Sequence, residues 1–124
     1  MSPRSKEFMD QAHDRLAIAR EILDSGHLAG AVSAAYYAML YAARAALSER
    51  DEYAKTHGGT WHLFRERYVA TEAFDEGLYT IATSAQTTRE QGDYEAVTPD
   101  AERAKAIVEG AADFIPAVEQ MLDA

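Results

Sequence analysis

The densest apolar stretch of the chain is residues 28–48, where Arg44 is the only charged side chain. This stretch is too long for a strand and too regular in small residues for a loop, so the pattern predicts a buried helix. A helix that is apolar all round must be covered on every side. At helical spacing, one stripe forms an ordinary core face made of Val32, Tyr36, Leu40, Ala43 and Leu47.

The opposite side of this predicted helix carries almost no side chain, because it is a row of alanines. A small bundle covers one face of a central helix well and a second face poorly, so we expect a second copy of the chain to cover this row. The alternative is that alanine is present simply as a strong helix former. A membrane span is excluded because Arg44 and three tyrosines would lie at bilayer depth. The row consists of Ala31, Ala34, Ala38, Ala42 and Ala45.

The N-terminal segment has helix signals at both ends. Ser2 followed by Pro3 is typical of an N-cap and a first helical residue. Apolar residues then recur at three- and four-residue steps as far as Leu23. The pair Ser25-Gly26 predicts the end of this helix. Because the turn that follows is short, we expect the first two helices to run antiparallel.

Three more helices are predicted after residue 50. The polar run at 50–57 and the pair Gly58-Gly59 indicate a loop, after which Thr60 caps a short helix. A longer amphipathic helix spans residues 74–92 and ends at Gly92. The pair Thr98-Pro99 begins the last helix. No segment alternates as a strand requires, so the sequence predicts an all-α fold, an antiparallel four-helix up-down bundle plus one short extra helix.

Composition and charge narrow the class of protein. A length of 124 residues predicts a single domain over 1–124 with one core. The absence of cysteine excludes disulfides and thiolate metal sites and fits a cytoplasmic protein, and the charged N-terminus lacks the apolar core of a secretion signal. A net charge of −9 disfavours a broad basic face for nucleic acid. Any nucleotide or RNA site must therefore be a local basic pocket in an acidic surface.

Arg44 is the first residue with candidate chemistry. A guanidinium on a largely buried helix cannot lose its charge and needs an anionic partner. One interpretation is a buried ion pair with Glu90 or Asp93 near the end of the fourth helix. The other is that Arg44, with Tyr37 and Tyr41 on the same stripe of the helix, lines a pocket for an anionic ligand.

Two further clusters are polar. Arg89 opens the run Arg-Glu-Gln-Gly-Asp-Tyr on the last turn of a helix, where the helix dipole favours a cation. Lys55-Thr56-His57 forms a small basic loop ahead of a helix. Two glycines separate His57 from His62, so the two histidines share no helix face and we expect no metal site. No cofactor-binding motif is present, and we expect no cofactor.

Taken in order and spacing, four segments resemble HEPN domains, the higher-eukaryote and prokaryote nucleotide-binding domains, of the small stand-alone prokaryotic type. The resemblance covers nearly the whole chain. It implies an antiparallel four-helix bundle with an extra short helix, a homodimer, and a paired minimal nucleotidyltransferase, often as a toxin–antitoxin couple. The segments are Ala34-Ala35-Tyr36-Tyr37-Ala38-Met39, Ala42-Ala43-Arg44, Lys55-Thr56-His57-Gly58, and Arg89 with Asp93-Tyr94.

Many HEPN domains are metal-independent ribonucleases, which use an arginine and a histidine four to six residues later to activate the ribose 2′-hydroxyl and protonate the leaving group. Arg89 matches the family's arginine, but residues 94–96 include no histidine. The pairs Arg50–His57 and Arg20–His27 fit the spacing elsewhere in the chain. Of these two, Arg50–His57 overlaps the Lys-Thr-His loop.

Three functions therefore stay open, and we favour the first, a dimeric module that binds a nucleotide, RNA or the nucleotidyltransferase. The second is a metal-independent ribonuclease toxin in which His57 and Arg89 are catalytic. The third is a purely structural interaction domain. Tyr94 is a candidate acceptor of a nucleotidyl group, although the His-x-Tyr context of that family motif is absent. The candidate ligand site comprises Tyr37, Tyr41, Arg44, Lys55, Thr56, His57, Arg89, Asp93 and Tyr94.

Overall fold

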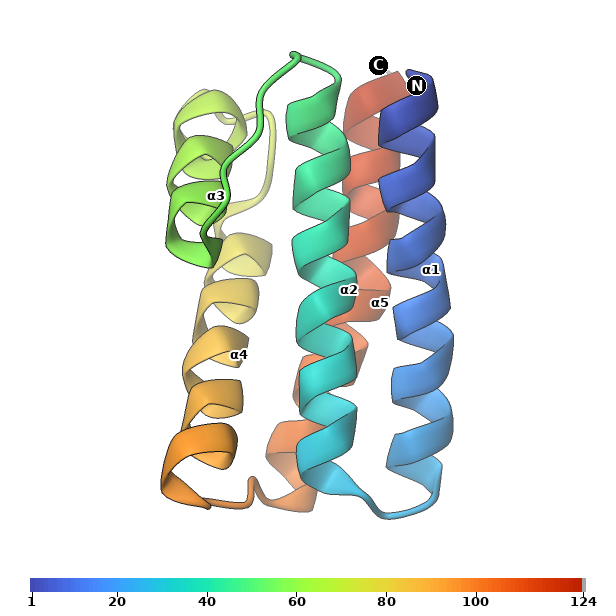
Figure 1. Cartoon of the computed structure of the whole chain (residues 1–124), viewed down its shortest axis with the longest axis vertical. Helices are drawn as coiled ribbons and strands as arrows, with labels where there is room; N and C mark the ends of the chain where they lie inside the picture. The colour runs from blue at the N-terminus through green and yellow to red at the C-terminus, as the bar shows by residue number, and fades with distance from the viewer. Residues whose placement is uncertain (124) are drawn as a thin grey trace.

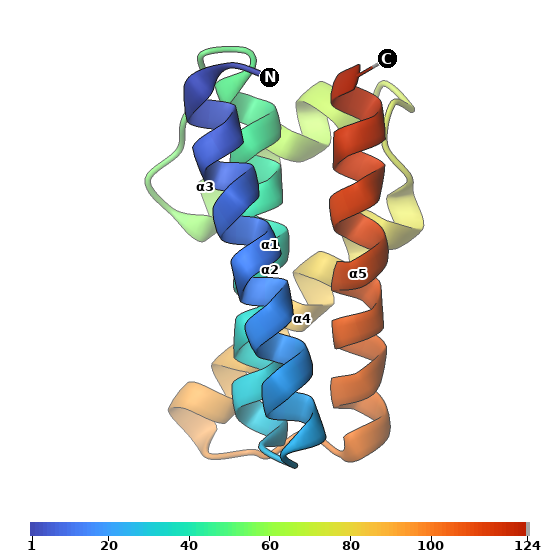
Figure 2. The ribbon, with the colours of Figure 1, turned by 90° about the vertical axis from the view of Figure 1, so that its right-hand side faces the viewer.

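The computed structural model describes residues 1–123, and these residues form helices and no strand. Four long helices lie along one axis and alternate in direction, while the short helix α3 sits above α4 at one corner (Figure 1). Turned by a quarter, the molecule shows the start of α1 and the end of α5 at the same end (Figure 2). The predicted all-α fold is confirmed. The elements are α1 (Pro3–Asp24), α2 (Leu28–Ser48), α3 (His57–Phe64), the π-helical turn η1 (Arg65–Val69), α4 (Glu76–Glu95) and α5 (Ala101–Asp123).

The boundaries predicted for the first two helices are confirmed. The Ser2 side chain accepts a hydrogen bond from the Ser5 backbone N–H at 3.1 Å, and Pro3 is the first residue of α1. Gly26 has a φ of 81°, a left-handed conformation that glycine adopts without steric cost. This turn reverses the chain between α1 and α2, which run antiparallel (Figure 1).

The predicted start of the short helix is wrong by four residues. Thr56, rather than Thr60, is the N-cap of α3, and its side chain accepts a hydrogen bond from the Gly59 backbone N–H at 2.9 Å. Gly58 and Gly59 therefore lie inside the helix rather than in a loop. The Thr60 hydroxyl is buried and donates to the Thr56 carbonyl oxygen at 2.9 Å. The hydrogen bond between the Thr56 side chain and the Gly59 N–H stabilises this helix start, and that gain outweighs the poor helix propensity of the two glycines.

The predicted end of the fourth helix at Gly92 and the predicted start of the last helix at Thr98-Pro99 are also wrong. Gly92 lies within α4, which continues until Ala96 takes a left-handed conformation with φ of 55°. The N-cap of α5 is Asp100 rather than Thr98, because Asp100 directly precedes the first helical residue and its Oδ1 accepts the Arg103 N–H at 2.7 Å.

The central helix of the structure is α2, which packs against α1, α3, α4 and α5. The expectation that a second copy of the chain covers the alanine row is wrong, because all five alanines are buried within the chain, none more than 8% exposed. Their small side chains let the neighbouring helices close over that face. The stripe of α2 left partly open is Ser33, Tyr37, Tyr41 and Arg44. Among the helices of residues 1–123, none combines the length and apolarity that crossing a membrane requires.

Candidate functional site

A hydrogen-bonded chain of three side chains centres on Tyr36, which is fully buried on α2. The Trp61 indole donates its Nε1–H to the Tyr36 hydroxyl oxygen at 3.1 Å. The same hydroxyl lies 3.0 Å from Nδ1 of His57, the first residue of α3. An indole N–H can only donate, so the hydroxyl oxygen accepts from Trp61. The hydroxyl's own proton has no acceptor within residues 1–123 other than Nδ1 of His57, and we therefore assign it to that bond. His57 therefore takes the tautomer with an unprotonated Nδ1 and an N–H at Nε2.

The protonation states of this chain follow from burial and charge. Burial raises the pKa of Tyr36 to about 12, so its hydroxyl keeps its proton at neutral pH. The pKa of His57 is lowered, first by burial and then by the positive charges of Arg89 and Arg44. His57 is therefore neutral near pH 7 and presents a hydrogen-bond donor at Nε2.

Arg89, on α4, is held against the same tyrosine. Its guanidinium carbon lies 5.3 Å from the centroid of the Tyr36 ring and 5.5 Å from that of Tyr37. Its Nη1 is 2.7 Å from Oδ2 of Asp93, one turn further along α4. The Arg89 side chain is only 12% exposed, and its Nε is buried with no hydrogen-bond partner within residues 1–123.

Arg44, on α2, makes no ion pair within residues 1–123, so the predicted pair with Glu90 or Asp93 is wrong. Asp93 is already bound by Arg89, its neighbour at four-residue spacing on α4. The Arg44 guanidinium instead lies 5.5 Å from the Tyr53 ring centroid, and its Nε is buried without an acceptor. We call the group formed by Tyr36, Tyr37, Arg44, His57 and Arg89 the Arg89 cluster.

The Arg89 cluster brings two guanidinium groups to one histidine in an acidic protein. Two guanidinium groups act on one imidazole, and Asp93, which is 47% exposed, neutralises only part of that charge. The charge of Glu90 also reaches the cluster, since it acts to raise the pKa of His57. A group of this kind can hold an anion through charge-assisted hydrogen bonds.

Four of the predicted site residues meet in this cluster, namely Tyr37, Arg44, His57 and Arg89. Asp93 lies at its edge through the ion pair with Arg89. The remaining four residues lie elsewhere. Thr56 caps α3, and Tyr41 stacks on Phe8 of α1 with ring centroids 6.2 Å apart. Lys55 is exposed, Tyr94 is 80% exposed, and neither forms an ion pair or side-chain hydrogen bond within residues 1–123.

Sequence reasoning missed Tyr36 and Trp61. The pattern predicts that Tyr36 lies on the core face of α2, and the structure confirms this, but its hydroxyl also contacts His57. A buried tyrosine or tryptophan nearly always finds a hydrogen-bond partner for its polar atom. Applied to the adjacent pair Tyr36-Tyr37, this rule indicates that the buried tyrosine has a hydrogen-bond partner, and it is the signal in the sequence that pointed to this contact.

The part of the chain that the structure describes contains no cluster of side chains that could bind a metal ion. Within residues 1–123, no three histidine, cysteine or acidic side chains are grouped to hold an ion. His62 lies one turn from Glu66, with Nε2 3.2 Å from Oε1, on the exposed side of α3.

The fold and the cluster define an all-helical domain with a buried arginine–tyrosine–histidine group. Residues 5–121 match the HEPN domain family, and the chain belongs to that family. It is 34% identical over 94 residues to UPF0332 protein glr0978 of Gloeobacter violaceus, covering 76% of this chain and 75% of that protein. It is 29% identical over 116 residues to a Methanocaldococcus jannaschii protein named "Putative toxin MJ0605", covering 93% of this chain and 86% of that protein.

Proposed function

We propose that the chain is a cytoplasmic, homodimeric HEPN module that binds a nucleotide or an RNA end at the Arg89 cluster. The observation that carries this proposal is the placement of Arg44 and Arg89 beside His57, each with a buried Nε that has no acceptor within residues 1–123. A buried donor without a partner costs about 1–3 kcal/mol of stability. Two such costs in one cluster indicate a role other than holding the fold together.

The cluster offers the donors that a phosphate group requires. The terminal nitrogens of Arg44 and Arg89 supply fixed positive charge, which gives stronger hydrogen bonds to phosphate oxygens than neutral donors do. His57 adds a neutral N–H at Nε2, which has no hydrogen-bond partner within residues 1–123. Tyr37 is half-buried beside them and provides a ring on which a base can stack.

A second candidate function is a metal-independent ribonuclease, and one observation favours it. Arg89 and His57 are 32 positions apart in the sequence, yet both contact Tyr36. In this candidate function, His57 would take the role of the histidine missing after Arg89. The Tyr36 bond works against this candidate, because a general base needs an unprotonated nitrogen facing the substrate and Tyr36 occupies the unprotonated Nδ1. We therefore rank binding above cleavage.

We further propose that the module pairs with a minimal nucleotidyltransferase in a toxin–antitoxin-like system. Family membership supports this pairing, as does the word toxin in the name of one relative. The proposed homodimer rests on the same membership and does not use the alanine row. Copurification of the tagged chain with a coexpressed small nucleotidyltransferase, and a dimeric mass by light scattering, are the expected results. A monomer that captures no such enzyme contradicts this part of the proposal.

Binding of a fluorescein-labelled uridine dinucleotide tests the site. We expect Arg89→Gln and Arg44→Gln each to weaken the affinity at least tenfold, since a charged hydrogen bond contributes about 1.5–3 kcal/mol. Arg65→Gln, at an exposed arginine of η1, is the matched control and should change affinity less than twofold. If wild type does not bind, or if Arg89→Gln binds as wild type does, the site proposal fails.

Cleavage is measured on the same samples with a longer RNA in EDTA. We expect no cleavage by wild type. Cleavage that disappears in His57→Ala reverses the ranking and makes the chain a ribonuclease. The purely structural alternative predicts that all three arginine variants change only the stability of the protein.

A further inference from the structure

The loop between α2 and α3, residues 49–56, leads directly into the Arg89 cluster. Its last residue, Thr56, caps α3, and the next residue in the chain is His57. No residue of this loop is buried, so the loop has no hydrophobic anchor of its own. A surface depression of about 340 Å³ lies between the loop and the start of α1, and it is lined in part by Glu52 and Tyr53. Side-chain contacts other than core packing must therefore hold the loop in place.

The way in which α2 ends brings Glu52 to η1. Asp51 takes a left-handed conformation with φ of 54°, which aspartate adopts more readily than most residues do. The Glu52 backbone N–H donates to the Leu47 carbonyl oxygen at 3.0 Å, and the Asp51 N–H donates to the Ser48 carbonyl oxygen at 3.1 Å. This pair of hydrogen bonds is the Schellman end of a helix. It turns the chain so that the Glu52 side chain reaches η1.

Glu52 and Arg67 form a bidentate ion pair between the loop and η1. Nε and Nη2 of Arg67 donate to different carboxylate oxygens of Glu52, each at 2.8 Å. Arg50 adds a longer hydrogen bond, from its Nε to Oε1 of Glu52 at 3.3 Å. The hydrogen bonds from Arg67 lower the pKa of Glu52, so this carboxylate is ionised at neutral pH. Arg67 lies in a π-helical turn, and such turns are frequent at functional sites.

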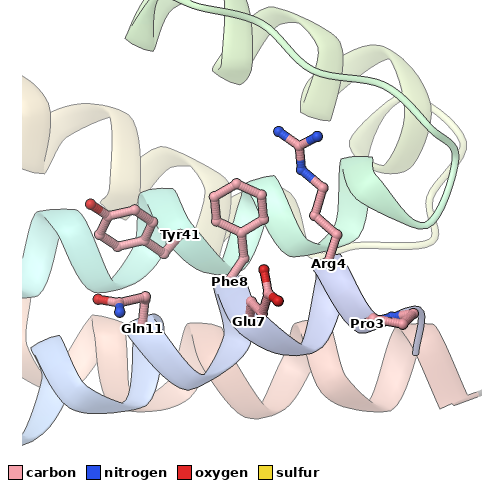
Figure 3. Close-up of a pocket in the computed structure, with 6 residues that line it drawn as sticks. All are labelled: Pro3, Arg4, Glu7, Phe8, Gln11 and Tyr41. Atoms are coloured by element: carbon pink, nitrogen blue, oxygen red, sulfur yellow. The ribbon is translucent and has the colours of Figure 1, made fainter.

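Tyr53, the residue after Glu52, contacts two guanidinium groups. Its ring centroid lies 5.5 Å from the guanidinium carbon of Arg44 and 5.3 Å from that of Arg4. Arg4 also lies 5.7 Å from the Phe8 ring centroid, and Figure 3 shows these two side chains at an open depression of about 750 Å³. The loop thus places an aromatic ring against one of the two arginines of the Arg89 cluster.

We propose that Glu52 and Arg67 are positioning residues for the Arg89 cluster. Their ion pair fixes the loop that carries Tyr53 and that leads to His57. A bidentate pair fixes orientation as well as distance, whereas a pair exposed by a quarter to a third contributes little to global stability. The effect of the pair is therefore local. The inference rests on the function proposed above and adds residues that shape the site without contacting the ligand.

The pKa of His57, measured by NMR titration of its imidazole protons, tests the proposal without a ligand. In Glu52→Gln and in Arg67→Gln the loop is released, so His57 becomes more exposed and lies further from Arg89 and Arg44. We expect the pKa to rise towards 6.5 in both variants. A direct charge effect would instead move the pKa in opposite directions, because one variant removes a negative charge and the other a positive charge.

Arg65→Gln and Glu76→Gln are the matched controls. These two residues form an ion pair from the same turn η1 to the first residue of α4, with a single contact at 3.4 Å. Neither substitution should change the pKa of His57. An unchanged pKa in both Glu52→Gln and Arg67→Gln, or shifts of opposite sign, overturns the proposal.

The contact between Tyr53 and Arg44 gives a second readout, which a change of charge does not reproduce. In the wild-type protein the Tyr53 ring should shift the side-chain proton signals of Arg44 upfield. Tyr53→Leu removes the ring and gives the signal position without it. We expect Glu52→Gln to move the Arg44 signals towards that position and Glu76→Gln to leave them unchanged. Arg44 signals that stay at their wild-type position in Glu52→Gln overturn the proposal.

Binding of the fluorescein-labelled uridine dinucleotide then connects the pair to the proposed function. We expect Glu52→Gln and Arg67→Gln each to weaken the affinity about threefold or more, because a released loop must be ordered on binding. Glu76→Gln should bind as wild type does. If wild type binds no dinucleotide, the proposed function fails, while the two NMR measurements still decide whether the pair positions the cluster. If wild type binds and Glu52→Gln binds equally tightly, the positioning role is refuted and the proposed site stands.

Discussion

The hydroxyl of Tyr36 lies 3.0 Å from Nδ1 of His57, joining the middle of α2 to the first residue of α3. Trp61 donates to the same hydroxyl, and the Tyr36 proton has no acceptor within residues 1–123 other than Nδ1 of His57, which assigns the tautomer of His57. A core residue thereby determines what the half-buried histidine presents to a ligand. This link between packing and chemistry is the basis for the first two predictions.

Removing the Tyr36 hydroxyl should destabilise the protein. Tyr36→Phe leaves the Trp61 indole N–H and His57 Nδ1 without their partner, and an unsatisfied buried polar group costs about 1–3 kcal/mol. Urea denaturation should therefore give a lower free energy of unfolding. Tyr41→Phe is the control, because the Tyr41 hydroxyl makes no hydrogen bond within residues 1–123. Equal stability of Tyr36→Phe and wild type would show that the three-residue chain is not formed.

The charge state of His57 should depend on Arg89. Its pKa in the folded protein lies below the ordinary value of 6.5, because of burial first and of Arg89 and Arg44 next. Arg89→Gln removes one of those charges, so the pKa of His57 should rise while staying below 6.5. An NMR titration of the imidazole protons measures this shift. Arg65→Gln should leave it unchanged, and an unaltered pKa in Arg89→Gln argues against the proximity of the two groups.

The lowered pKa of His57 also makes the free energy of unfolding depend on pH, in a direction that can be stated. Below pH 6.5 the unfolded chain protonates His57 while the folded protein resists protonation, so the unfolded state binds more protons. The stabilising contribution is therefore present above pH 6.5 and is lost as the pH falls towards the folded pKa. In His57→Gln, the free energy of unfolding should change less over this pH range than it does in wild type.

The helices α4 and α5 come close together at Gly110. A methyl group added there would lie 2.5 Å from Cγ2 of Ile81, a branch too short and stiff to move aside freely. Gly110→Ala should lower the free energy of unfolding by about 1–3 kcal/mol, despite the better helix propensity of alanine. Gly58→Ala is the matched control, since a methyl group at that helical position meets nothing within 4 Å. A Gly110→Ala protein as stable as Gly58→Ala would contradict the close packing.

Much of the fold could be predicted from local signals, and the site could be predicted only in part. The start of α1 follows from Ser2-Pro3. The two ends of α2 follow from Gly26, which precedes it, and from the apolar run 28–48, in which Arg44 is the only charged residue. Thr56 and Thr60 lie four residues apart and both suit a cap, so the sequence alone did not separate them. In the structure Thr56 caps α3, while the buried Thr60 hydroxyl donates to the Thr56 carbonyl oxygen.

The composition of the cluster could not be read from spacing, because it is assembled by tertiary packing. Arg89 and His57 lie on different helices and meet only through Tyr36 on a third. The predicted partner of Arg44 is wrong because Asp93 forms its ion pair with Arg89, which lies on the same helix. The alanine row misled for a similar reason: a row of small side chains is compatible with a close neighbour from the same chain or from another.

The most direct test of the central claim is an amide NMR titration of the wild-type protein with unlabelled uridine dinucleotide. We expect chemical-shift changes to centre on the α2 residues around Tyr36, on the first turn of α3 and on Arg89, and to vanish in Arg89→Gln. Shifts confined to the outer face of α5, or none at saturating dinucleotide, would contradict a phosphate site at the Arg89 cluster.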